Sequence, residues 1–249
     1  MSETSSITPI KKRFDFPRAL ALLFHPRQAF NAEAASGWLT PMLILSASAI
    51  LAVIVSGFLK ARAALNGNVQ LPPDFQYWTP EMQQNFFQSQ QATQGAVFVY
   101  VMPLVGALFS LWLGWLIFSG ILHLTSTLLG GRGSMGGALN LVAWASLPFA
   151  VRDVLRIVFM LAARHAITSP GLSGFASAGG FGAQILMLVD LFYLWYILLL
   201  ILGLGIADSL SKGKAIAGVM IVIVVSLLAQ AGMGTLTASL GGLAVQPFF

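Results

Sequence analysis

Three charged side chains interrupt an otherwise apolar stretch at residues 150–160, which reads AVRDVLRIVFM. Arg152 and Arg156 are four residues apart and would share one face of a helix, where Asp153 can reach Arg156 at a spacing of three. An unpaired charge in the centre of a bilayer costs at least about 2.5 to 3.5 kcal/mol, so such groups pair with one another or face water. Because only 8% of the chain is charged, this stretch is the first candidate for a functional site.

A fourth charge, Asp190, is expected at the same depth in the next helix. Arg156 lies six residues, about 9 Å of helix, below the predicted end of its span, and Asp190 lies five residues into the following span. The match predicts an ion pair between Arg156 and Asp190, with Arg152 and Asp153 in the same charge-neutral cluster toward the outer third of the membrane. Two roles stay open: the cluster locks two helices together, or it lines a hydrated cavity for an ion, a proton or an anionic ligand.

Other motifs lack a part that their chemistry requires. The loop GGRGSMGG at residues 130–137 lacks the Lys and Ser/Thr that follow the last glycine of a phosphate-binding P-loop. Ser173, in a Gly-x-Ser-Gly motif, has no later histidine to serve as its base. The three histidines have no ligand residue three or four positions away, and the chain has no cysteine. We therefore expect no catalytic residue, no metal site and no cofactor.

The composition is that of an integral membrane protein. Of 249 residues, 57% are hydrophobic, compared with roughly 45–50% in soluble domains. The basic residues do not alternate with stacking aromatic residues outside the apolar stretches, so nucleic acid is not an expected partner. Five stretches have the roughly 20 mostly apolar residues that a membrane-spanning helix needs, and they lie near residues 39–59, 95–122, 138–162, 185–206 and 215–238. The predicted fold is all-α: a tail of residues 1–35 and a polytopic bundle of five transmembrane helices at residues 36–249.

The positions of Lys and Arg predict the orientation, because connections rich in these residues stay in the cytoplasm. The side that holds the N-terminal tail carries eight of them, and the opposite side carries three. With five spans, the N-terminus is expected in the cytoplasm and the C-terminus outside.

The tail contains an amphipathic pattern. Phe16, Leu20 and Phe24 recur at helical spacing, with Arg18 and Arg27 between and beyond them. This pattern predicts a short helix in the inner headgroup layer; a helix packed beneath the bundle is the alternative.

The largest predicted connection is the outer loop at residues 60–94. Thr79, Pro80 and Glu81 combine a capping hydroxyl, a proline at the first helical position and an acid in the first turn. We expect a polar helix to begin there and to continue into the second span.

Four segments carry a family resemblance: FHPRQAF at residues 24–30, ASLPF at 145–149, DLFYLWYILLLILGLG at 190–205 and DSLSKGKA at 208–215. They resemble the Yip1 domain family of five-span membrane proteins. The resemblance implies a cytoplasmic N-terminus, a five-helix bundle and no catalytic motif. In eukaryotes it implies vesicle trafficking with Rab-type GTPases and related five-span partners, but the DLYGP-type segments tied to that role are not found here. The short tail and the absence of cysteine look more like a bacterial inner-membrane member.

These patterns favour a non-enzymatic protein that acts by association in the lipid bilayer. It would bind itself or serve as an accessory or scaffold component of a membrane complex, such as an export or trafficking machine. Five glycines suit close contact between helices, or ordinary packing within the bundle: Gly203, Gly205, Gly218, Gly232 and Gly234. The alternative is a small channel or carrier that uses the four charges, although few other polar residues are present to line its path.

Overall fold

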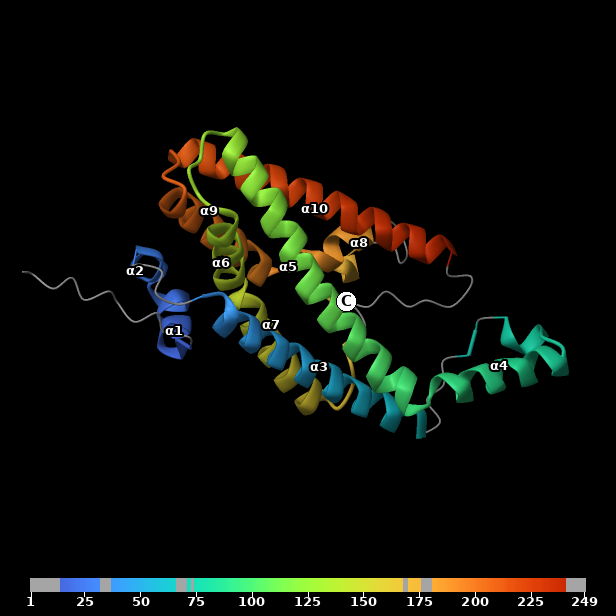
Figure 1. The fold of residues 1–249 in the computed structure, drawn as a ribbon. Coiled ribbons are helices and arrows are strands. Elements are labelled where there is room, and N and C mark those ends of the chain that lie inside the picture. Colours follow the sequence, from blue (N-terminus) through green and yellow to red (C-terminus); the bar gives the residue numbers. More distant parts are fainter. Residues whose placement is uncertain are drawn as a thin grey trace, which may run out of the picture.

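The computed structural model of the chain describes residues 14–31, 37–65, 71–72, 74–167, 170–175 and 181–240. Within these ranges the regular structure consists of helices, without a strand. The longest helices form an elongated bundle, from which one helical unit extends to the side (Figure 1). The predicted all-α fold is confirmed for this part of the chain.

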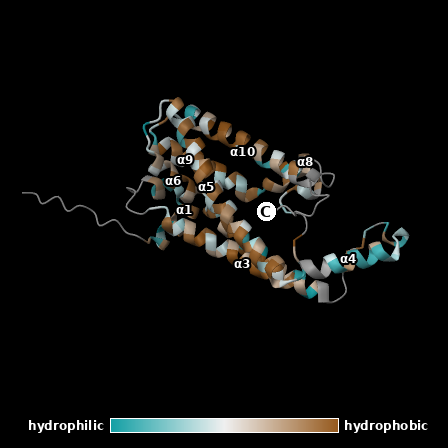
Figure 2. Ribbon diagram, turned by 45° about the vertical axis from the view of Figure 1, so that its right-hand side comes forward, coloured by the Kyte–Doolittle hydropathy of each residue, from teal (hydrophilic) through white to brown (hydrophobic). Residues whose placement is uncertain are grey.

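Three helices are long and apolar enough to cross a membrane: α3 (Leu39–Leu65), α5 (Met102–Leu128) together with the π-helical segment η2 (Val97–Val101) before it, and α10 (Lys212–Leu240). A fourth candidate is a broken span, in which α8 (Phe181–Leu188) and α9 (Leu191–Ala207) are bent by 66° from one another. Hydrophobic residues dominate the bundle, whereas the unit at its side is largely hydrophilic (Figure 2). These helices correspond to four of the five predicted spans.

The segment predicted as one helix at residues 138–162 is two helices, α6 (Met135–Ala145) and α7 (Leu147–Ala163). The prediction of a continuous helix is wrong because Pro148, in the first turn of α7, has no N–H to donate to the carbonyl of Trp144. With 11 and 17 residues, the two helices are about 16 and 25 Å long, and neither alone crosses roughly 30 Å of hydrocarbon. By length and composition, the described residues contain three candidate spans, or four with the bent pair.

The unit at the side of the bundle contains α4 (Pro80–Thr93), which begins as predicted: Thr79 Oγ1 accepts the N–H of Met82 at 3.3 Å. The expected continuation into the next span is wrong, because a turn at residues 94–95 separates α4 from η2. The 3₁₀ turn η1 (Phe75–Tyr77) folds back onto α4. Their aromatic rings pack at centroid distances of 5.4 to 5.8 Å and come from Phe75, Trp78, Phe86 and Phe87.

The largest hydrophobic core joins α5, α6, α9 and α10 to the tail helix α1 (Phe16–Phe24) and its neighbour α2 (Pro26–Asn31). Its central side chains are at most 1% exposed and include Leu22, Leu122, Trp144, Leu200 and Val219. The tail helices α1 and α2 are therefore part of the folded bundle. A smaller cluster of Met42, Leu45, Ala143 and Ala150 joins α3 to α6 and α7.

The loops at the end of the bundle where α5 ends and α10 begins close around Asp208. The carboxylate is buried and accepts a hydrogen bond from Ser126 Oγ. It also lies against Gly133, where a Cβ atom would overlap the carboxylate. Lys214 Nζ donates to the carbonyl of Leu129 at 2.7 Å. Close approach to Asp208 therefore explains why the loop at residues 130–137 has a glycine at position 133.

Candidate functional site

Asp190 is the centre of a group of charged side chains that joins α7 to α9. Its Oδ2 atom lies 3.6 Å from Arg156 Nη2 and 3.5 Å from Arg152 Nη1. Arg152 Nε lies 3.8 Å from Asp153 Oδ1. The structure thus brings together the four residues that the sequence singled out, and we refer to them as the charge cluster.

The break between α8 and α9 positions Asp190. Its backbone is extended, and Oδ1 caps α9 by accepting the N–H of Tyr193 at 2.9 Å. A carboxylate at this place also interacts favourably with the positive end of the helix dipole. One carboxylate oxygen of Asp190 therefore caps the N-terminus of α9, while the other contacts the two arginines.

Ser48 connects a third helix, α3, to the charge cluster. Its hydroxyl donates to Asp153 Oδ2 at 3.0 Å, and the residue is buried. Sequence reasoning did not find Ser48, because Ser46 and Ser56 stand in the same apolar segment. Only the packing of α3 against α7 selects one of the three hydroxyls.

Ser48 also shows the depth of the cluster. It follows Leu39, the first residue of α3, by nine residues, which is about 13 to 14 Å of helix. Asp153 lies at this level of α3. Further along both helices, Leu59 of α3 packs against Ile157 and Met160 in the last turns of α7.

Arg152 has an aromatic neighbour in addition to the two acids. Its Cζ atom lies 4.8 Å from the centroid of the Phe149 ring, within the range of a cation–π interaction. Phe149 packs in turn against Tyr193 and Tyr196, at centroid distances of 6.3 and 5.0 Å. Aromatic rings thus form one wall of the charge cluster.

Arg18 holds the tail helix against the bundle. Its Cζ atom lies 4.8 Å from the centroid of the Trp144 ring, and its Nη2 donates to the carbonyl of Ala29 at 3.0 Å. Asp15 accepts the N–H of Arg18 at 3.2 Å, and its own N–H donates to Thr40 Oγ1 at 3.0 Å. Burial lowers the pKa of Arg18, and the nearby charge of Asp15 opposes that effect.

The opposite face of α1 is open. Phe16, Leu20 and Phe24 are 55, 64 and 74% exposed, and Arg27 is exposed as well. The tail helix therefore packs on the bundle with one face and presents a hydrophobic face on the other.

The remaining sequence candidates show ordinary contacts. Ser173 Oγ donates to the carbonyl of Pro170 at 2.7 Å, and His165 packs edge-on against the ring of Phe159. Among the residues that the structure describes, no three His, Asp or Glu side chains gather as they would around a metal ion. What the charge cluster can do chemically is neutralise charge, hold helices together and donate hydrogen bonds.

Comparison with known families agrees with the motifs. A family model described as the Yip1 domain matches residues 20–233, which include the second half of the tail helix α1, the charge cluster and most of α10. Neither the curated proteins nor the solved structures give a match. The resemblance seen in the sequence is confirmed, and together with the long apolar helices it identifies an integral membrane protein.

Replacing Asp190 with Asn should destabilise the bundle. Asparagine still caps a helix, so Asp190→Asn removes only the charge and leaves two arginines facing a single acid. Breaking a buried ion pair costs roughly 3 to 5 kcal/mol; since these side chains are 16 to 27% exposed, we expect about 1 to 3 kcal/mol. Thermal unfolding of the purified protein in detergent would measure the loss, and adding Arg156→Gln should restore part of it.

Asp74→Asn provides the matched control, because it makes the same chemical change at an exposed residue. It should leave the unfolding temperature unchanged. A stable Asp190→Asn variant, or a double variant that is no better than the single one, would contradict the ion pair.

Replacing Arg18 with Ala should release the tail helix. The change removes the contact with Trp144 and the hydrogen bond to Ala29, which together contribute about 1 to 2 kcal/mol. Chymotrypsin should then cut after Phe24 faster than in the wild type. Arg27→Ala, at an exposed arginine of the same tail, should not change the rate; equal cleavage of both variants would argue against docking through Arg18.

Proposed function

Because the chain belongs to the Yip1 domain family, we propose that it is a non-enzymatic membrane protein that acts by association. It binds itself or serves as an accessory or scaffold component of a membrane complex, such as an export or trafficking machine. One observation carries the proposal: in the span that contains α5, no residue of an 18-residue apolar window is fully buried by the described part of the chain.

The open side of α5 has the pattern of a packing surface. Val105, Phe109 and Leu113 are 58, 65 and 40% exposed and follow one another at intervals of four residues. This spacing places them on one stripe of the helix. Lipid covers such a stripe in a single subunit, and a helix of another chain covers it in a complex. The charges within the membrane neutralise one another, so the apolar faces are what the bundle offers to a partner.

The exposed face of α1 would contact the inner leaflet of the membrane. We place Phe16, Leu20 and Phe24 among the acyl chains and Arg27 among the headgroups, as in other interfacial helices. The contact between Asp15 and Thr40, at the start of α3, supports this position. The distribution of Lys and Arg supports a cytoplasmic N-terminus. We count α6 and α7 together as a fifth span, which puts the C-terminus outside, and we place the protein in a bacterial inner membrane, which the absence of cysteine fits.

A small channel or carrier is the second candidate, and the partial exposure of the charge cluster favours it. A path across the membrane would need further polar groups on both sides of the cluster. Along α7, the residues that flank it toward the core are apolar: Phe149 on one side and Ile157 and Met160 on the other. Association is therefore the better supported function.

A photo-crosslinking amino acid at Phe109 should capture a discrete partner in native membranes. The adduct, identified by mass spectrometry, would be a second copy of the chain for self-assembly or one reproducible protein for an accessory role. The same probe at Leu122, which is 0% exposed, is the control and should give no intermolecular product. Lipid adducts alone at Phe109, together with solute flux through vesicles that contain the purified monomer, would favour the channel instead.

The absence of cysteine allows a direct test of orientation. Ser89→Cys in α4 and Ser211→Cys before α10 each introduce one thiol at an exposed position. A membrane-impermeant maleimide should label the first in intact cells and the second only after permeabilisation. The reverse pattern would invert the proposed orientation.

A further inference from the structure

Arg152 and Arg156 have more N–H donors than the described residues have acceptors near them. A guanidinium group carries five N–H donors. Within the described residues, the one hydrogen bond from either group runs from Arg152 Nη1 to Asp190 Oδ2 at 3.5 Å, and the ion pairs span 3.5 to 3.8 Å. Direct charge-assisted bonds are shorter, about 2.7 to 2.9 Å. Arg152 Nε is buried and has no hydrogen-bond partner.

The acids of the charge cluster do not fill this need. Asp153 Oδ2 already accepts from Ser48, and Asp190 Oδ1 accepts from the N–H of Tyr193. Two arginines and two acids balance the charge, but the hydrogen bonding is left incomplete. In hydrocarbon, a donor without an acceptor is strongly unfavourable. What the cluster lacks is acceptor oxygens.

The described residues leave one side of the cluster partly exposed. Arg152 and Arg156 are 23 and 27% exposed, and their neighbours along the same edge of α7, Leu155 and Phe159, are each 53% exposed. The bend at Asp190 turns α8 by 66° and packs it against α10. Among the described helices, α8 therefore does not cover this edge of α7.

The depth of Arg156 suits a lipid headgroup. The residue lies seven positions before Ala163, the last residue of α7, which is about 10 Å of helix. Long arginine side chains in membranes extend toward the headgroup region, and the bilayer thins locally around them. The apolar faces of Leu155 and Phe159 provide a surface for the acyl chains of the same lipid.

We propose that Arg152 and Arg156 bind the phosphate group of a phospholipid in the leaflet at the C-terminal end of α7. The phosphodiester oxygens accept from both guanidinium groups, whose planar forks match phosphate. Because Asp153 and Asp190 keep the cluster neutral, a zwitterionic headgroup such as phosphoethanolamine fits best, since it adds no net charge. This site is independent of whether the protein associates with a partner. Free phosphate offers the same oxygens, and the experiment separates the two sources.

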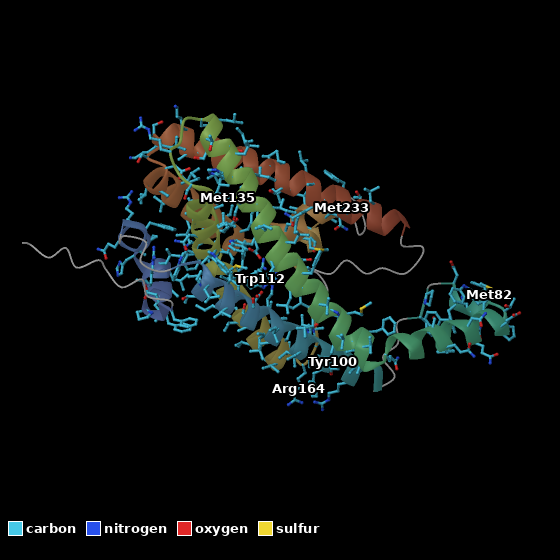
Figure 3. The ribbon with its side chains drawn as sticks, in the orientation of Figure 1. Met82, Tyr100, Trp112, Met135, Arg164 and Met233 are labelled. Carbon is cyan, nitrogen blue, oxygen red and sulfur yellow. The ribbon has the colours of Figure 1, made fainter. Side chains whose placement is uncertain are left out.

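Native mass spectrometry of the full chain tests the site. The protein is released from nanodiscs that contain phosphatidylethanolamine and diacylglycerol with the same acyl chains. We expect the wild type to retain one phosphatidylethanolamine, and retention to fall at least about fivefold in the Arg152→Gln, Arg156→Gln double variant. Arg164→Gln is the matched control, because Arg164, labelled in Figure 3, directly follows the last residue of α7 and lies eight positions after Arg156. It should retain lipid as the wild type does.

Two further variants separate lipid binding from the helix lock. Asp190→Asn weakens the lock but leaves both guanidinium groups, so it should retain the phospholipid at least as well as the wild type. Arg156→Lys keeps the charge but loses the planar fork, so it should lose retention even if the double Gln variant does not fold.

Three results would overturn the proposal. The first is equal phospholipid retention by the wild type and the folded Arg156→Lys variant. The second is retention of diacylglycerol as strong as that of phosphatidylethanolamine, because diacylglycerol has no phosphate. The third is an adduct with inorganic phosphate in lipid-free detergent and no retained phospholipid, which would assign the arginines to free phosphate.

Discussion

A charge inside a bilayer must be neutralised within the protein or reach water. Asp190 contacts both Arg152 and Arg156, and together with Asp153 it neutralises them. The same carboxylate starts α9, so the break in the fourth candidate span and the ion pairs depend on each other. Ser48 extends the arrangement to α3 through Asp153. Three helices that are far apart in the sequence are thereby held at one level of the membrane.

A partly buried charge is also stabilised by neighbouring groups in the tail, at the edge of the bundle. Arg18 is partly buried, and it is stabilised by the Trp144 ring and by a backbone carbonyl. Trp144 lies at the end of α6, directly before the interruption that Pro148 imposes, and Phe149, just after that interruption, packs against Arg152. The break between α6 and α7 thus supplies one aromatic partner to each of two arginines. Docking of the tail and neutralisation of the charge cluster are built on the same part of the chain.

The charge cluster is electrically neutral, but its hydrogen-bond donors are not all matched by acceptors among the described residues. The four charges cancel, which suits a structural lock between helices, but the guanidinium donors exceed the acceptors that the described residues provide. Among the described helices, α8 bends toward α10 and leaves the cluster partly exposed. Ion pairs hold the helices of this bundle together, and its outer faces are apolar. This combination suits a protein that acts by association with other components of the membrane.

The sequence by itself determined the all-α membrane class, the positions of four candidate spans and the common depth of Arg156 and Asp190. These follow from apolar length and from the fixed rise of a helix, both of which are properties of a single segment. It also located the start of α4 at Thr79, since capping is local. Only the tertiary structure decided that α8 bends away, that Ser48 rather than Ser46 or Ser56 binds Asp153, and that Asp208 needs a glycine at position 133. Those features depend on how distant segments rotate and pack against one another, which no local pattern of residues specifies.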